Sequence, residues 1–165
     1  MNALTIAVSL LAQAQAEPQT LALQVEGVQR TALVYAPESS RSKPAPLVFC
    51  WHGHGGGSRQ AALSFQMHRN WPGAISVYPQ GLPTSTKNDP DGARNGWQIT
   101  SNGPLGGRDL KFFDALFARL QKDYRVDLDR VYCMGHSNGG RFTYVLWQAR
   151  GDVFAAFGPS GSPAL

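Results

Sequence analysis

The sequence predicts an α/β fold with a mainly parallel sheet and helices on both faces. Two observations favour it: short, continuous apolar runs that suit strands buried on both sides, and an amphipathic helical stripe between such runs. A third is the order of the elements, two opening strands followed by alternating strands and helices. With 165 residues, 42% of them hydrophobic and 16% charged, the chain has room for one domain with a core.

The expected elements begin with a hairpin, 21–25 and 31–35, turning at Glu26-Gly27. Ser58 and Asp109 are the expected N-caps of two helices. The remaining elements are expected in this order: strand 47–51, helix 58–69, strand 74–78, helix 109–124, a turn at 126–130, strand 131–134, helix 142–148 and strand 153–157. Between them, residues 80–108 have no periodicity, which predicts a long loop that is functional or mobile.

The N-terminus predicts secretion. Residues 1–16 carry no charge, contain the apolar stretch Leu4–Leu11, and end in Ala14-Gln15-Ala16 before Glu17. This pattern is typical of a signal peptide, and it predicts an extracellular or periplasmic protein whose domain covers residues 17–165. No Lys or Arg precedes the apolar stretch, so a start further upstream, an atypical signal or a badly assigned N-terminus stays open.

Charge and cysteine content exclude several classes of protein. The net charge is +4, but the fifteen Lys and Arg residues are scattered, so we expect no nucleic-acid partner. No segment after residue 16 is apolar and long enough to cross a membrane, and nothing indicates an obligate protein partner. Cys50 and Cys133 lie in strand-like apolar runs and are expected to be buried thiols, with a disulfide as the alternative.

A nucleophile motif follows the strand at 131–134. Gly135-His136-Ser137-Asn138-Gly139 has the pattern Gly-x-Ser-x-Gly between a strand and a helix, the context this motif requires. A nucleophilic serine must stand on a sharp turn, where side chains two residues away on either side would collide. The sequence therefore predicts Ser137 as a catalytic nucleophile, with Gly135 and Gly139 supporting the turn.

A glycine cluster, His52-Gly53-His54-Gly55-Gly56-Gly57, follows the strand at 47–51. A second oxyanion donor belongs after such a strand. We expect the N–H of Asn138 and an N–H at His54 or Gly55 to form the oxyanion hole, and His52 and Gly53 to support the loop. Trp97 is expected to form a substrate wall beside the serine, with a core-anchoring role equally open.

Five segments of the sequence carry a family resemblance: Trp51–Gly56, Tyr78–Gly81, Asn95–Trp97, Arg130–Tyr132 and Gly135–Gly140. Together they resemble the secreted polyhydroxybutyrate depolymerase and feruloyl esterase group of the α/β-hydrolase fold, and the resemblance spans about residues 21–162. It implies an acyl-enzyme mechanism at Ser137 on an ester substrate, polymeric or small, with no metal and no organic cofactor.

The acid and the histidine of this fold should follow the serine along the chain. Only 28 residues follow Ser137, and they contain no histidine and one carboxylate, Asp152. We therefore expect a fragment, truncated after about the sixth strand and nearly inactive by itself. A peptidase of the same fold and a non-catalytic polymer- or carbohydrate-binding module remain alternatives. A calcium loop at Asp89–Gly92 is not favoured, because Lys87 and Gln98 occupy positions where acidic ligands are needed.

Overall fold

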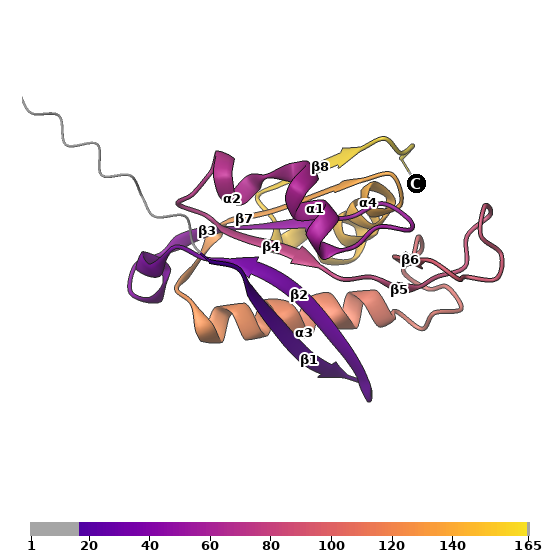
Figure 1. The fold of residues 1–165 in the computed structure, drawn as a ribbon, viewed down its shortest axis with the longest axis horizontal. Coiled ribbons are helices and arrows are strands. Elements are labelled where there is room, and N and C mark those ends of the chain that lie inside the picture. The colour runs from indigo at the N-terminus through magenta and orange to yellow at the C-terminus, as the bar shows by residue number, and fades with distance from the viewer. Residues whose placement is uncertain (1–16, 165) are drawn as a thin grey trace, which may run out of the picture.

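A mixed sheet of six strands forms the centre of the computed structural model, which describes residues 17–164 (Figure 1). The strand order is β1-β2-β4-β3-β7-β8. The last four of these run parallel to one another, and the hairpin β1-β2 joins them antiparallel through β4. This confirms the predicted mainly parallel sheet. The strands are β1 (Gln19–Val25), β2 (Val28–Tyr35), β3 (Ala45–Trp51), β4 (Ile75–Pro79), β7 (Val126–His136) and β8 (Ala156–Ser160).

Helices cover both faces of the sheet, as predicted. On one face, α3 (Arg108–Asp123) and α4 (Asn138–Arg150) bury an apolar core that includes Phe49 and Trp51. On the other face, α1 (Ser58–Phe65) and α2 (Met67–Asn70) cover a smaller cluster. β3 is buried along its whole length because it lies between these two layers, which explains its continuous apolar sequence.

The opening hairpin is fixed by its turn and by a contact with α3. Glu26 and Gly27 have φ of 50° and 79°, the left-handed geometry that a two-residue hairpin turn requires. Arg30 on β2 reaches α3, where its guanidinium donates to the fully buried Asp109 carboxylate at 2.8 Å. The expected N-cap role of Asp109 is wrong, because α3 begins at Arg108 and the cap position is Gly107. Asp109 instead pairs with the guanidinium of Arg30 and balances its buried positive charge.

The two cysteines lie on opposite faces of the sheet. Cys133 belongs to the core under α3 and α4, where it accepts a hydrogen bond from the Trp51 indole at 3.1 Å, whereas Cys50 lies in the cluster under α1. Both are free and buried. Burial raises the pKa of the Cys133 thiol to about 12, so it is held as a neutral thiol. The prediction of buried thiols is confirmed, and the disulfide alternative fails because the side chains diverge across the sheet.

Several boundaries differ from the sequence prediction. β7 starts at Val126 because Ala45 pairs with that residue, so 126–130 is strand rather than turn. The helix expected over 58–69 breaks at Gln66, which has φ of 50°, and Ser58 is its first residue rather than its cap. The last strand begins three residues later than expected, because a 3-10 turn, η2 (Gly151–Val153), precedes it. Short elements of this kind carry little periodicity of their own.

The long segment between β4 and α3 is anchored rather than free of structure. It contains a two-stranded ribbon, β5 (Leu82–Pro83) and β6 (Asn95–Gly96), and it buries Trp97 and Gln98. A 3-10 turn, η1 (Glu38–Arg41), joins the hairpin to β3. The predicted signal peptide, 1–16, lies outside the described residues. Within 17–164, no helix has the length and apolar character needed to cross a membrane.

Candidate active site

Ser137 stands alone between a strand and a helix. β7 ends at His136, α4 begins at Asn138, and Ser137 has φ of 54° and ψ of −117°. This is a costly backbone conformation for a residue with a side chain, and such strain collects at functional sites. A Cβ on Gly135 would lie 2.3 Å from the carbonyl oxygen of Gly139, and a Cβ on Gly139 would lie 2.2 Å from that of Trp51. Both positions therefore require glycine.

The glycine loop lies directly against this turn. A Cβ built on Gly53 would be 3.6 Å from the Cβ of Ser137, although the two residues are 84 positions apart. β3 and β7 are neighbouring parallel strands, so the turns that follow them meet at one edge of the sheet. His52, Gly53, His54 and Ser137 together line a cleft of about 480 Å³. The two predicted elements are thus brought together.

Two backbone donors of the loop are already in use. The N–H of Gly55 donates to the Asn95 carbonyl at 2.7 Å, and the N–H of Gly56 donates to the Gly53 carbonyl at 3.0 Å. Gly55 is therefore not an oxyanion donor in this structure, which corrects that part of the prediction. Within residues 17–164, the N–H of His54 has no acceptor. Asn138 is the first residue of α4, where an N–H has no intrahelical partner.

His52 is a structural part of the loop. The N–H of Gly81 donates to its Nε2 at 2.9 Å, so Nδ1 carries the proton and donates to the Gly53 carbonyl at 2.7 Å. Burial lowers the pKa of His52, which favours this neutral form. The ring joins the β3 turn to the start of the long loop. These bonds are the kind of support expected of His52.

The Asn138 side chain forms two hydrogen bonds with the backbone of Trp97. Its Oδ1 accepts the Trp97 N–H at 2.7 Å, and its Nδ2 donates to the Trp97 carbonyl at 3.0 Å. The Trp97 indole N–H then donates to the His52 carbonyl at 2.9 Å. Through these bonds, Asn138, the residue after Ser137, is linked by way of Trp97 to the glycine loop. The sequence gives no local indication of this link, because both side chains find their partners across the fold.

Trp97 is a core residue. Its side chain is 0% exposed and packs against Trp51 and Phe142, with ring centroids 4.9 and 5.5 Å away. It lines neither of the clefts that Ser137 lines. The expected substrate-wall role is therefore wrong, and the core-anchoring alternative is the one that the structure supports.

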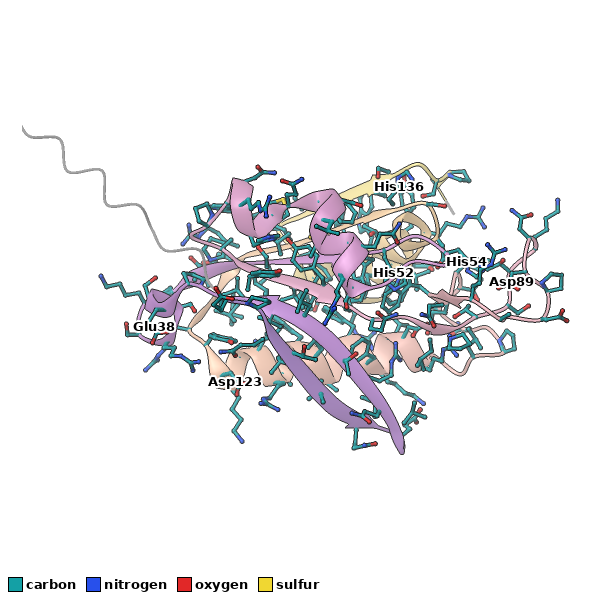
Figure 2. The ribbon with its side chains drawn as sticks, viewed as in Figure 1. Glu38, His52, His54, Asp89, Asp123 and His136 are labelled. Atoms are coloured by element: carbon teal, nitrogen blue, oxygen red, sulfur yellow. The ribbon has the colours of Figure 1, made fainter. Side chains whose placement is uncertain are left out.

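His54 and Asp89, both labelled in Figure 2, form a polar pair, and His54 lines the same cleft as Ser137. His54 Nε2 lies 2.9 Å from Asp89 Oδ2. The Asp89 carboxylate also accepts the N–H groups of Arg94 and Ala93. The bond from the Arg94 N–H, helped by His54, lowers the pKa of Asp89. The Asp89 carboxylate thus stabilises its own loop through these hydrogen bonds. The sequence suggested it only as part of a rejected calcium loop.

Within residues 17–164, no hydrogen bond joins Ser137 Oγ to an imidazole. His136 is exposed, and its Nδ1 lies 3.3 Å from Ser160 Oγ. His68 is 2.9 Å from the Tyr78 hydroxyl and stacks on Tyr35, and it is 69 positions from Ser137 along the chain. His52 and His54 have the partners described above. Each of these imidazoles therefore has another partner in the described residues, and none is hydrogen-bonded to Ser137 Oγ.

Known proteins give a consistent comparison. No family model matches the chain. It is 28% identical over 140 residues to the bifunctional acetylxylan esterase/xylanase XynS20E of Neocallimastix patriciarum, covering 84% of this chain and 19% of the relative. It is 26% identical over 145 residues to feruloyl esterase D of Neurospora crassa, covering 84% and 47%. The chain thus spans less than half the length of these curated relatives.

The fold has a close structural counterpart. A solved ferulic acid esterase superposes with a TM-score of 0.65 at 20% identity, over 87% of this chain and 58% of that one. At this identity the similarity establishes the fold. The chain therefore has the α/β-hydrolase fold, and the proteins it resembles in sequence are feruloyl and acetylxylan esterases.

Proposed function

We propose that this chain is the nucleophile-bearing part of a secreted carboxylic ester hydrolase that works through an acyl-enzyme on Ser137. The observation that carries the proposal is the strained backbone of Ser137 on a sharp strand-to-helix turn, held against a glycine loop. A structural serine has no need of this conformation, whereas a nucleophile must project its hydroxyl into a cleft. The similarity to feruloyl and acetylxylan esterases supports the ester class.

The proposal gives each group a chemical role. The Ser137 oxygen attacks the ester carbonyl, its proton passes to a base, and the alcohol leaves from the tetrahedral intermediate. The N–H groups of Asn138 and His54 receive the negative charge, assisted by the positive end of α4. We propose that the acid and the base are supplied by residues outside this chain, because each of its histidines has another hydrogen-bond partner in the described structure and none is bonded to Ser137 Oγ.

For the substrate we favour acetyl or feruloyl esters of plant cell-wall polysaccharide over a polyhydroxybutyrate-like polyester. The names of the relatives support the first class. The cleft of about 480 Å³ is large enough for an acyl group, and Ala61 and Phe65 of α1 give it an apolar wall. Polyester hydrolysis remains the second candidate, on the earlier family resemblance.

Labelling with a fluorophosphonate probe tests the nucleophile directly. We expect intact-mass and peptide analysis to place the adduct on Ser137, and Ser137→Ala to lose it. Ser39→Ala is the matched control, because Ser39 is exposed on η1 and its side chain makes no hydrogen bond in the described structure. Equal labelling of the wild-type chain and Ser137→Ala would contradict the assignment.

Turnover should be measured in a protein extended by the downstream residues. It should hydrolyse short p-nitrophenyl esters, acetylated xylan or methyl ferulate, and Ser137→Ala should abolish this. The 165-residue chain alone should be nearly inactive, since a serine without a base is a weak nucleophile. Cleavage of peptides rather than esters would favour a peptidase. Polymer binding with neither turnover nor labelling would favour a non-catalytic module.

A further inference from the structure

Ser137 lies between two clefts rather than at the end of one. The first, of about 480 Å³, lies toward α1 and the glycine loop. The second, of about 280 Å³, lies toward Thr86–Asn88 of the long loop and the first turn of α4. Ser137 and His54 line both. An ester consists of an acyl part and an alcohol part. If the serine between the two clefts attacks the ester carbonyl, the acyl part can bind in one cleft and the alcohol part in the other.

The two clefts differ in charge. The first is lined by neutral side chains and the imidazoles of three histidines, with no permanent charge. The second contains two permanent cations, Lys87 and Arg141, and no carboxylate. The residues that line the second cleft therefore include two cations and no anion.

These cations are not neutralised within the described residues. No ion pair in 17–164 involves Lys87 or Arg141, and the first turn of α4 contains no acidic residue. Asp89 does not line this cleft; it is bonded to His54, which does, and it also accepts bonds from Arg94 and Ala93. An arginine that is only partly exposed, without a carboxylate, beside a nucleophile is suited to an anion from outside.

A neutral hydrogen-bonding group points to a ligand in the same cleft. The Oγ of Ser162 is buried, lines the second cleft and has no hydrogen-bond partner within 17–164. A buried hydroxyl normally finds a partner, and a bound anion would accept a hydrogen bond from it. Asn88 adds a further amide at the rim.

We infer that the second cleft binds a carboxylate carried by the ester substrate, with Arg141 as the main contact and Lys87 as a second cation. The inference rests on the proposed function, since it assigns the charged side of the substrate of that same site. It predicts a preference for esters of acidic saccharides or acidic acyl groups over their neutral counterparts.

Binding without turnover tests this inference independently of catalysis. The ¹⁵N-labelled full chain is titrated with glucose, glucuronate and glucose 6-phosphate, and amide shifts are followed by NMR. We expect glucuronate to shift amides of Thr86–Asn88, Arg141 and Ser162, and glucose to leave them unchanged. Because both cations face solvent, affinity should fall as salt rises from about 50 mM to about 500 mM.

Matched variants locate the effect. Arg141→Gln should weaken glucuronate binding by about fivefold or more, and Arg141→Lys should recover part of it, because the charge stays while the planar fork is lost. Lys122→Gln removes the same charge from the exposed surface of α3 and should change nothing. Unchanged folding of each variant is read from the same spectra.

Three outcomes would overturn the inference: equal binding of glucose and glucuronate, shifts that map away from the second cleft, or equal losses in Arg141→Gln and Lys122→Gln. A preference for glucose 6-phosphate over glucuronate by more than about tenfold would overturn the carboxylate assignment. None of these bears on Ser137, whose role is decided by probe labelling.

Discussion

Two turns meet at the site, and they are built in opposite ways. The turn from β7 to α4 uses one residue, Ser137, in a strained conformation enforced by glycines at 135 and 139. The turn from β3 to α1 uses six residues, 52–57, and its shape is held by bonds to distant side chains and backbone. The first turn is specified by steric exclusion in its own sequence. The second depends on partners that reach it across the fold.

The short turn should be the more easily destroyed. Gly135→Ala and Gly139→Ala each place a Cβ within 2.3 Å of backbone that lies in the sheet and helix. Because backbone cannot yield as a flexible side chain does, we expect losses of about 3 kcal/mol or more in unfolding free energy, or failure to fold. Urea unfolding measures this. Gly73→Ala is the control, since nothing lies within 4 Å of its added Cβ. Equal effects at Gly73 and Gly139 would refute the steric argument.

The link between the two turns should show the next largest effect. Asn138→Ala leaves the buried N–H and carbonyl of Trp97 without partners, so we expect a loss of about 2–3 kcal/mol. Hydrogen exchange of the loop amides should rise with it, because Trp97 also bonds the His52 carbonyl. Gln148→Ala, exposed on the same helix, is the control. If Asn138→Ala unfolds at the same urea concentration as the wild-type protein, the link between the two turns does not contribute to stability.

The long turn should respond to pH through His52. Burial lowers its pKa, so the native state resists protonation while the unfolded state accepts a proton near the ordinary value of 6.5. The unfolded state then binds more protons, and stability falls as pH drops below 6.5 toward the folded pKa. Urea unfolding at about pH 7.5 and about pH 5.5 should show this loss. His52→Gln should reduce the pH difference, and His136→Gln, at an exposed position, should retain it. The same difference in all three proteins would exclude His52 as its source.

The smallest effect is expected at Gly55. Its φ of 78° disfavours a side chain, but the nearest atom to an added Cβ is the Arg94 side chain at 3.4 Å, which can move. Gly55→Ala should therefore cost about 1 kcal/mol, and Gly55→Asn less, because asparagine tolerates this region. Thermal unfolding of both variants measures the difference. If Gly55→Ala loses as much stability as Gly139→Ala, the long turn also has no room for a side chain at this position.

Much of the fold could be predicted because its signals are local. The apolar run of β3 and the apolar stripe of α3 predict that these elements are buried, and Glu26-Gly27 predicts the hairpin turn. Asp109 misled because an acidic residue before an apolar stripe is typical of a cap, whereas here it is buried against Arg30, which lies 79 positions away. Residues 126–130 misled because Val126 pairs with Ala45 and the register of β7 against β3 then shifts before Val131, so the polar residues between them form an irregular part of the strand.

The candidate site divides in the same way. By itself, the sequence determined the order of strands and helices and the place of Ser137, since glycine spacing and apolar runs act on neighbours along the chain. Only the tertiary structure decided that Trp97 is core, that Gly55 is already bonded, that Asp89 holds His54, and that Arg141 and Lys87 share a cleft with Ser137. The physical reason is that hydrogen-bond partners, burial and charge are set by packing between elements far apart in sequence, and no local pattern encodes them.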